Sequence, residues 1–385
     1  MRKELTGEAR SWAIAGHGKN GLGNLAKEAI RQLGKPEVAE RLCLKPKAEN
    51  VFSRYGVMSA DGETKMYESV DEISELPDVL FVTMPSADDG EAAYQLISRF
   101  LKEGKTVVTA EKGALANNFS ALKKQSNNFR RLGIDTTVGG GTHLMRAAEM
   151  YCRDLDNISE IHLALNGTLN ALFSSIAPPD LAGMSLGQAV DQAVRLGFAD
   201  SPEDGKPRTP YDVIRDEAER DVPKKVAIFF NYLGFGKVPV GWRDLIGKLS
   251  DEEIDRAIED ASNRRFIVSI YPQRFQKKDK KSPESDIIGK LVVPHEGWTI
   301  VSGFRRIKSN PFFFPLGTLM GAKNGGVVAV GPDESDGDFW PGIGPGAGPS
   351  QTVNAMIDDY VGLRRQQQML DDYVEEVLQR QNSLV

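Results

Sequence analysis

The sequence predicts an α/β chain that begins with a doubly wound, mostly parallel sheet and continues into a second domain of the α+β class. Three observations predict this fold class. Strand-like and helix-like segments alternate as far as Gly139, a glycine-rich turn joins the first strand to the first helix, and a strand-rich block follows at residues 265–330. With 385 residues, the chain is long enough to form two hydrophobic cores.

The first strand and the first helix flank the glycine turn. The apolar run Ser11 to Ala15 predicts the strand, GHGKNGLG follows it, and Asn24 to Leu33 predicts a helix that Gly34 and Pro36 stop. Further strands are predicted in VFSRYGVM, DVLFVTMP and KTVVTA, and the helix AAYQLISRFLKEG lies between the last two. Strands separated by helices of this length pair in parallel, so we expect a first domain over residues 1–145.

The pattern changes after Gly139. The next segments are EIHLALNGTLNALFSSI and the helical LGQAVDQAVRLGF. A polar stretch from Ala199 to Pro210 follows, and after it come two more helical segments, KKVAIFFNYLGFG and SDEEIDRAIEDA. The strand-rich block then predicts an antiparallel or mixed sheet, so we expect a second domain over residues 146–335. In the remaining segment, 336–385, GIGPGAGPSQTVNAMIDDYVGL predicts a glycine turn that opens a helix.

Composition narrows the class of protein. A net charge of -6 argues against sequence-independent binding to nucleic acid, which requires clustered Lys and Arg. The two cysteines, Cys43 and Cys152, lie far apart in apolar surroundings, which favours two core residues over a disulfide framework or a thiolate metal site. The sequence shows neither a secretory apolar region nor a membrane-spanning run, so we expect a cytoplasmic protein that does not bind membranes.

Gly16, Gly18 and Gly21 match G-x-G-x-x-G directly after a predicted strand and before a predicted helix. In this pattern the first glycine permits a tight turn, the second lets a pyrophosphate approach the backbone, and the third allows close packing of helix on strand. Together with Lys19 and Asn20, these glycines predict a Rossmann-like dinucleotide-binding loop. The alternative is a glycine turn without a ligand.

The end of the second strand bears on the choice between NAD and NADP. We place that strand at Val51 and Phe52, running into Ser53 and Arg54. An acidic residue at this position would bind a ribose 2′-hydroxyl, whereas an arginine accommodates a 2′-phosphate. Arg54 therefore favours NADP over NAD, and the alternative is a solvated surface arginine.

From Asp78 onward, six motifs resemble, in order, those of homoserine dehydrogenases. They are TAEKGALA, TTVGGGTHL, LNGTLNAL, LGFAD, DVPKKVAI and GPGAGPSQTVNA, similar to T-A-N-K, V-G-G-G-x-P, L-N-G-T-x-N, G-Y-x-E, D-x-x-x-K and G-x-G-A-G-x-x-T-A. The resemblance implies an NAD(P)-dependent oxidoreductase that interconverts L-homoserine and L-aspartate 4-semialdehyde in threonine and methionine biosynthesis. It also implies a homodimer formed through residues 265–330, a C-terminal segment that returns to the nucleotide domain, and a short form without an appended regulatory domain.

Hydride transfer to an aldehyde needs a group that donates the hydroxyl proton, and a lysine whose pKa is depressed can do so. Lys225 lies one helical turn after Asp221, so the two side chains share a face. The resemblance implies that Lys225 is the acid–base lysine, Asp221 its partner, and Lys112 a second lysine at the end of KTVVTA. The alternatives are a surface ion pair, or Lys224 in this role if the register is shifted by one residue.

The resemblance places Asp200 where the family holds the substrate's amino end with a glutamate. An insertion within Glu203–Arg220 follows it, so either Asp200 reaches the substrate by a shift of its loop, or Glu203, Glu217 or Glu219 substitutes. The other positions implied for the substrate are Asn166, Gly167 and Thr168, and those for the cofactor are Met84, Pro85, Thr109, Lys112, Gly197, Gly344 and Gly346. A plain Gly/Pro linker is the alternative for the last two glycines.

Two further departures from the family pattern are Glu111, in place of Asn, and His143, in place of Pro. His143 is either a proton relay or a neutral histidine bonded to the backbone. The resemblance also implies a weak site for a monovalent cation such as Na⁺ at the backbone carbonyls of Val138, Gly140 and Thr142. The other histidines, His17, His162 and His295, show no i,i+4 spacing, which gives a transition-metal site little support.

Two rival functions remain. One is a dehydrogenase of the same fold that acts on another hydroxy or amino acid, which the departures at Glu111, His143 and Asp200 keep open. The other is a non-catalytic nucleotide-binding sensor. Retention of both Lys112 and Lys225 argues against the sensor.

Overall fold

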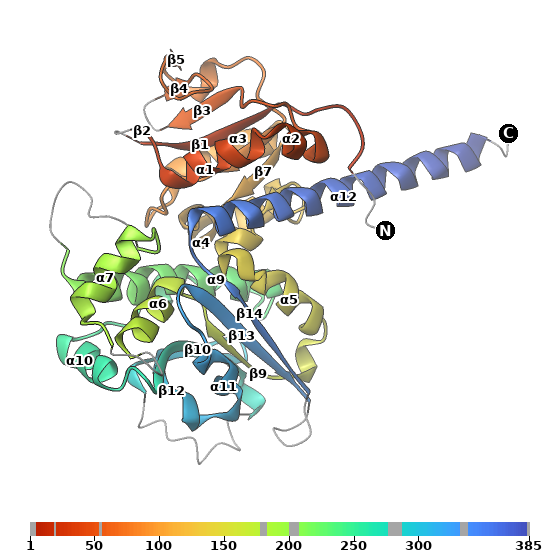
Figure 1. The fold of residues 1–385 in the computed structure, drawn as a ribbon. Helices are drawn as coiled ribbons and strands as arrows, with labels where there is room; N and C mark the ends of the chain where they lie inside the picture. Colours follow the sequence, from red (N-terminus) through yellow and green to blue (C-terminus); the bar gives the residue numbers. More distant parts are fainter. Residues whose placement is uncertain are drawn as a thin grey trace. The chain divides into compact units, whose positions relative to one another are not determined.

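The structure is a computed structural model that describes residues 5–18, 21–53, 56–177, 183–199, 208–275, 287–331 and 338–382 (Figure 1). It forms two compact units. Unit 1 consists of Met1–Thr136 and Val353–Val385, and unit 2 of Thr137–Thr352. The divisions fall at 136 and 352, against the 145 and 335 expected from the sequence, because the glycine turn after 137 and the last strand both pack within unit 2.

Unit 1 is built on an eight-stranded sheet in which five strands run in parallel. The sheet has the order β5-β4-β3-β1-β6-β7-β8, and β2 pairs with the end of β1. The strands are β1 (Trp12–Gly18), β2 (Gly21–Leu22), β3 (Asn50–Ser53), β4 (Gly56–Met58), β5 (Lys65–Tyr67), β6 (Val79–Val82), β7 (Thr106–Thr109) and β8 (Leu132–Gly133). Since β1, β3, β6, β7 and β8 are the parallel strands, the predicted Rossmann-like sheet is confirmed.

The helices of unit 1 are α1 (Asn24–Leu33), α2 (Pro36–Leu42), α3 (Glu91–Lys102), α4 (Gly113–Gln125) and most of α12 (Pro349–Asn382). α1 ends at Leu33, and Gly34 is its C-cap residue, as predicted. Pro36 was predicted only to stop this helix, but it also begins the next one. It opens α2 at the first-turn position, where a missing N–H costs no helical hydrogen bond. Buried side chains of α12, among them Val353, Met356 and Tyr360, pack in one core with those of β1 and β6.

Unit 2 is an α+β unit, as predicted. Its six-stranded sheet has the order β11-β12-β10-β9-β13-β14, and every pairing is antiparallel. The strands are β9 (Ile158–Ala164), β10 (Arg264–Pro272), β11 (Ile288–His295), β12 (Trp298–Arg306), β13 (Lys323–Val330) and β14 (Asp338–Pro345). The sheet therefore extends beyond the predicted block to include β9 and β14.

The helices of unit 2 are α5 (Leu144–Tyr151), α6 (Gly167–Ile176), α7 (Leu186–Arg195), α8 (Pro210–Asp216), α9 (Val222–Leu233), α10 (Asp251–Glu259) and α11 (Phe314–Gly317). A single π-helical turn, Glu217–Asp221, joins α8 to α9. Such wide turns are rare, and they occur frequently at functional sites. This one carries three of the acidic residues singled out from the sequence, Glu217, Glu219 and Asp221.

The histidines whose partners the structure gives are held by neighbouring groups of the protein. Nε2 of His17 lies 3.1 Å from the Gly62 carbonyl, and Nε2 of His295 lies 2.8 Å from the Val238 carbonyl. Fully buried His162 contacts Glu160 Oε2 at 2.7 Å and Ser269 Oγ at 2.8 Å. The described residues contain no group of three or more His, Cys, Asp or Glu that could hold a metal ion.

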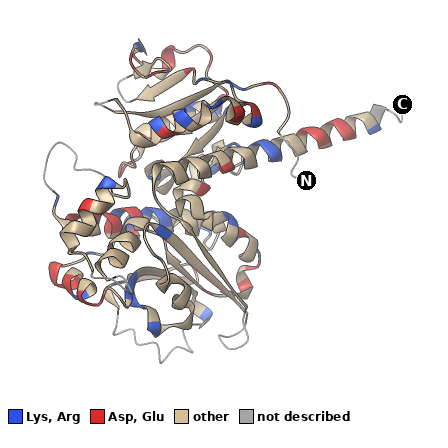
Figure 2. Ribbon diagram, viewed as in Figure 1, with Lys and Arg blue, Asp and Glu red and all other residues tan. Residues whose placement is uncertain are grey.

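The remaining composition-based expectations concern cysteines, charge and membranes. Both cysteines are free, and burial raises the pKa of Cys152 to about 12. Basic and acidic residues are interspersed along the described chain (Figure 2). No helix in the described ranges combines the length and apolar character that crossing a membrane requires.

Candidate functional site

The glycine turn forms a short hairpin before the first helix begins. β1 continues to Gly18, and β2 turns back so that His17 pairs with Leu22 and Gly18 with Gly21. α1 begins only at Asn24, with Gly23 at its N-cap. Lys19 and Asn20, which we assigned to the cofactor loop, lie outside the described residues.

The glycines of the turn have different packing roles from those predicted. A Cβ on Gly16 would lie 2.2 Å from Thr83 Oγ1 and 2.9 Å from Ala26 Cβ, so Gly16 permits the close approach of strand and helix. The prediction that Gly21 has this role is wrong, because the hairpin delays the helix and no described atom lies within 4 Å of its Cβ position. Gly21 instead has a φ of +97°, which favours glycine.

Few described atoms lie near the backbone at Gly18 and Gly21. Gly18 is exposed, and the one atom near its Cβ position is the Gly21 carbonyl oxygen at 3.9 Å. Close by, the buried Nδ1 of His17 has no hydrogen-bond partner among the described residues. Among the described residues, the backbone of the turn is thus uncovered at these two glycines.

The loops at the carboxyl ends of β6 and β7 lie along the same sheet edge as the glycine turn, because β1, β6 and β7 are neighbouring parallel strands. The Thr83 hydroxyl donates to the Ala15 carbonyl at 2.8 Å and ties β6 to β1. Half-buried Met84 and exposed Pro85 follow Thr83. Arg54, expected at the end of β3, lies outside the described residues.

Lys112 and Glu111 follow β7, whose last residue is Thr109. The Lys112 backbone N–H donates to Ser86 Oγ at 3.0 Å, and Lys112 occupies the N-cap position of α4. Glu111 is 1% exposed, and its two carboxylate oxygens accept from the N–H groups of Gly113 at 2.6 Å and Ala114 at 2.8 Å. The glutamate that departs from the family pattern therefore caps a helix, where a negative charge is stabilising.

In unit 2, four polar side chains meet at the junction between β9 and α6. Buried Asn166 caps α6 by accepting from the Leu169 N–H at 2.7 Å. Its Nδ2 donates to Glu217 Oε2 at 2.5 Å and to Asp221 Oδ2 at 2.8 Å. Asp221 Oδ2 also lies 2.6 Å from Lys225 Nζ. We call Asn166, Glu217, Asp221 and Lys225 the lysine cluster.

Lys225, and not Lys224, faces this cluster. Lys225 is 8% exposed, and its Nζ also donates to the Leu165 carbonyl at 3.0 Å. Lys224 Nζ lies 5.0 Å from the centre of the Trp242 ring, which makes a cation–π contact. The burial of Lys225 is also unlike that of a surface i,i+4 pair, which keeps both charges in water.

Of the carboxylates considered for the substrate's amino end, the structure brings Glu217 into the cluster. Glu219, two residues later, accepts from the Leu249 N–H at 2.8 Å and belongs to a different contact. Asp200 and Glu203 lie outside the described residues. Sequence reasoning did not predict that the Asn166 amide joins Glu217 to Asp221. The signal in the sequence that could have drawn attention to Asn166 is its position as an N-cap directly before α6.

Three other residues assigned to the substrate or the cofactor are Gly167 and Thr168, in the first turn of α6, and Gly197, just after α7. The Thr168 hydroxyl donates to the Phe198 carbonyl at 2.5 Å. A Cβ on Gly167 would lie 3.1 Å from both the Ala322 oxygen and the Ala347 Cβ. Gly197 has a φ of +70°, a conformation that favours glycine.

The turn Val138–Thr142 packs against the end of β14, which contains Gly344, and against Gly346 just after it. A Cβ on Gly140 would lie 2.9 Å from the Gly346 oxygen, and one on Gly344 would lie 2.9 Å from the Thr142 Cα. The Thr142 hydroxyl donates to the Pro345 carbonyl at 3.2 Å. Gly344 and Gly346 therefore do not belong to a plain linker, because they allow two backbones to touch.

His143 and Asn324 lie beside this turn. His143 has a φ of +52° and is the N-cap residue of α5. Asn324, which sequence reasoning missed, is fully buried, and a Cβ on Gly346 would lie 2.3 Å from its Cγ. The carbonyls of Val138, Gly140 and Thr142 belong to this packed turn.

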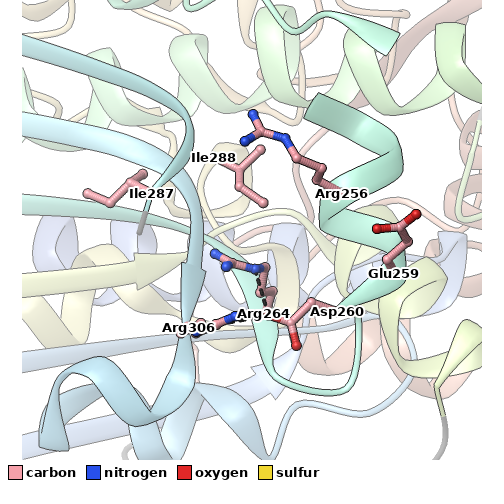
Figure 3. A pocket seen from close by; sticks show the side chains of 7 residues that line it. All are labelled: Arg256, Glu259, Asp260, Arg264, Ile287, Ile288 and Arg306. Carbon is pink, nitrogen blue, oxygen red and sulfur yellow. Dashed lines mark hydrogen bonds and ion pairs between the residues drawn. The ribbon is translucent and has the colours of Figure 1, made fainter. Parts of the chain in front are cut away.

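A hollow of about 300 Å³ lies elsewhere in unit 2, between α10 and the β11–β12 edge (Figure 3). Asp260 Oδ2 accepts from the Nε atoms of Arg264 and Arg306, each at 2.9 Å, and so offsets two of the three arginines that line the hollow. Its lining includes no member of the lysine cluster. We therefore interpret the charged side chains that line the hollow as a structural network of ion pairs, not as part of the candidate site.

Comparisons with known proteins bear on this arrangement. No family model matches the chain. The chain is 26% identical over 294 residues to an NAD(+)-dependent homoserine dehydrogenase of Pseudomonas canavaninivorans, an alignment that covers 74% of this chain and 69% of the relative. It is 25% identical over 300 residues to a homoserine dehydrogenase of Methanocaldococcus jannaschii, which covers 76% and 75% of the two chains.

Solved structures share the fold. The homoserine dehydrogenase of Thermoplasma acidophilum superposes with a TM-score of 0.63 at 19% identity, over 92% of this chain and 99% of that one. A hyperthermophilic archaeal homoserine dehydrogenase in complex with NADPH has a TM-score of 0.58 at 18% identity, over 93% and 98% of the two chains. The family resemblance predicted from the motifs is therefore confirmed: the chain is similar to homoserine dehydrogenases in sequence and has their fold.

Proposed function

We propose that the chain is an NAD(P)-dependent homoserine dehydrogenase that interconverts L-homoserine and L-aspartate 4-semialdehyde. The observation that carries the proposal is the pair of buried Lys225 and partly exposed Asp221, which lie 2.6 Å apart in a chain that is similar to these enzymes. A lysine held in this way can exchange a proton with a substrate oxygen. The glycine turn of unit 1 supplies the matching dinucleotide loop.

When bound, a reduced nicotinamide would supply the hydride to the aldehyde carbon, and an oxidised one would accept it from homoserine. Lys225 donates its proton to the aldehyde oxygen as the carbon is reduced, and in the reverse direction it takes the hydroxyl proton of homoserine. The Leu165 carbonyl and Asp221 fix the position of Nζ through contacts of 3.0 and 2.6 Å. Lys112, at the start of α4, is the second lysine of the proposed site.

For the cofactor, we propose that Gly16, Gly18 and Gly21 hold the pyrophosphate, as their packing and open backbone support. The neighbouring edge residues assigned to the cofactor are Met84, Pro85, Thr109 and Lys112, and the unit 2 residues are Gly197, Gly344 and Gly346. A preference for NADP rests on Arg54, so Arg54→Asp is expected to shift the KM ratio of the two cofactors toward NAD.

Three further features belong to the proposal. Unit 1 is the nucleotide-binding domain, and unit 2 binds the substrate and forms a homodimer through its strand-rich block. The Val138, Gly140 and Thr142 carbonyls bind a monovalent cation such as Na⁺. The protein acts in the cytoplasm.

The test is oxidation of L-homoserine by the purified full chain with NAD⁺ and with NADP⁺, followed by absorbance of the reduced cofactor. We expect turnover with homoserine and its loss in Lys225→Ala. Turnover of another hydroxy or amino acid, with none for homoserine, would support an oxidoreductase of different specificity. Cofactor binding without any turnover would instead support a sensor.

A further inference from the structure

We propose that unit 1 has an anion-binding site between the N-terminal segment 5–10 and helix α12, and that this site takes a tetrahedral oxyanion such as phosphate or sulfate. Arg10 supplies one guanidinium group, and α12 supplies a second from Arg364 and a hydroxyl from Tyr360. The site goes beyond the proposed function, because it lies at the opposite end of β1 from the glycine turn. Since β1 spans Trp12–Gly18 at about 3.3 Å per residue, its two ends are roughly 20 Å apart.

Two hydrogen-bond donors on one face of α12 are buried without an acceptor. Tyr360 and Arg364 are one helical turn apart, and they are 0% and 5% exposed. Neither the Tyr360 hydroxyl nor the Arg364 Nε has a hydrogen-bond partner among the described residues. The guanidinium of Arg364 makes one long hydrogen bond within the described ranges, from Nη2 to the Thr6 carbonyl at 3.5 Å. A buried donor without a partner costs free energy, which an acceptor placed here would recover.

The charges at this place favour an acceptor that is negative. Burial and the nearby charge of Arg364 lower the pKa of Arg10. Asp78 and Asp371 act on Arg10 in the opposite direction, but more weakly than Arg364 does, and no described carboxylate forms an ion pair with either arginine. The hollow of unit 2 differs, because Asp260 there accepts from two arginines. A water molecule could accept the unused bonds, but only an anion also offsets the two positive charges.

The N-terminal segment is fixed to α12 beside these arginines. Gln368 Nε2 donates to the Thr6 carbonyl at 2.7 Å and to Thr6 Oγ1 at 3.0 Å. Arg10 Nη2 donates to Gln367 Oε1 at 3.4 Å. Burial raises the pKa of Tyr360 to about 12, so its hydroxyl keeps the proton that it would donate. An anion held between Arg10 and α12 would therefore strengthen the attachment of the segment to the helix.

The experiment measures the binding of inorganic phosphate to the full chain by isothermal titration calorimetry, with chloride used to keep the ionic strength constant. NADPH is present at a saturating concentration, so that phosphate does not enter the dinucleotide loop. We expect one site with a Kd of roughly 0.1–1 mM. Arg364→Met and Arg10→Met should each weaken binding at least about tenfold, because each removes a charged hydrogen-bond donor.

Arg256→Met is the matched control, because Arg256 lines the hollow of unit 2. It should bind phosphate as the wild type does. A wild type that shows no saturable binding would overturn the inference. So would binding that is lost in Arg256→Met and kept in Arg364→Met, since phosphate would then occupy the hollow.

Thermal unfolding separates a ligand site from a structural arginine. Without phosphate, Arg364→Met should melt no lower than the wild type, because it removes a buried charge that has no carboxylate partner. In 10 mM phosphate the wild type should melt about 3–10 °C higher and the variant should not change, which makes the wild type the more stable of the two. A purely structural Arg364 would instead lower the melting temperature of the variant equally with and without phosphate, and this result would contradict the inference.

Tyr360→Phe tests the same site if Arg364→Met does not fold, because it removes the hydroxyl alone. It should weaken phosphate binding roughly tenfold. An unchanged Kd in this variant would count against the site. Glycerol 3-phosphate identifies the source of the oxyanion: tighter binding than inorganic phosphate supports a phosphate monoester as the ligand, and weaker binding supports the free ion.

Discussion

Replacing Lys225 by methionine removes the proposed proton donor and keeps most of its volume. General acid catalysis by a positioned side chain contributes about 10²–10⁴-fold, so we expect kcat to fall by that factor, which is about 3–5 kcal/mol of barrier. The change also removes the cation that lies 2.6 Å from Asp221. Breaking a buried pair costs about 3–5 kcal/mol of unfolding free energy, and partial exposure of Asp221, at 19%, favours the lower value.

Lys225→Arg separates charge from proton transfer. Arginine keeps the positive charge beside Asp221, but its pKa is too high for it to exchange a proton at neutral pH. We therefore expect near-wild-type stability in urea unfolding together with the same loss of kcat. Lys224→Met is the matched control, since Lys224 contacts the Trp242 ring. It should cost about 0.5–2 kcal/mol of stability and leave kcat within about twofold.

The assay is steady-state oxidation of L-homoserine, with NADPH binding measured separately by fluorescence. Lys225→Met and Lys225→Arg should both bind NADPH as the wild type does. A Lys225→Arg variant that retains more than about a tenth of the wild-type kcat would show that Lys225 acts through its charge alone and would refute the assignment.

Other predictions follow from packing, capping and charge. Gly16→Ala should weaken NADPH binding at least tenfold and lower the melting temperature, because its Cβ would lie 2.2 Å from Thr83 Oγ1; unchanged fluorescence titrations would contradict this. Glu111→Ala should cost about 1–2 kcal/mol in urea unfolding, because it removes the cap of α4, and a loss below a few tenths would argue against the cap. Burial opposes ionisation of Glu160, but its charge interaction and hydrogen bond with His162 and a hydrogen bond from Asn310 outweigh this effect and lower the pKa of Glu160. Its ionised form therefore stabilises the fold above the unfolded pKa near 4.5, and this stability is lost as pH falls through the lower folded value. Glu160→Gln should flatten the dependence of unfolding free energy on pH in this acidic range.

Much of the fold follows from local patterns. The alternation of apolar strands and amphipathic helices predicted the parallel sheet of unit 1, since its period and element lengths need no knowledge of distant contacts. The helix α2 was missed, because Pro36 was interpreted as a stop, although a proline is equally compatible with the first turn of a new helix. The strand β14 was placed outside the second sheet because its glycines and prolines resemble a linker, although it pairs with β13, the strand directly before it in sequence.

The sequence suggested individual residues for the candidate site, but not the contacts that join them. The spacing of Asp221 and Lys225 predicted a shared helix face, and the structure places the two side chains in contact. The spacing could not predict that Asn166 joins Glu217 to this pair, because β9 brings that amide from 51 residues away in sequence. A π-helical turn likewise has no sequence signature that periodicity detects.

The amide of Asn166 has a thermodynamic consequence for ligand binding. Because the carboxylates of Glu217 and Asp221 are already held by hydrogen bonds within the protein, their side-chain rotamers are fixed when the chain folds. Ordering a side chain at the moment of binding costs about 0.5–1.5 kcal/mol, so two preorganised carboxylates spare a ligand about 1–3 kcal/mol. This difference corresponds to roughly 5- to 150-fold in affinity. Within the proposed function, the neutral Asn166 amide beside the reacting lysine thus contributes to how tightly the site binds its substrate, because it orders two carboxylates before the substrate arrives.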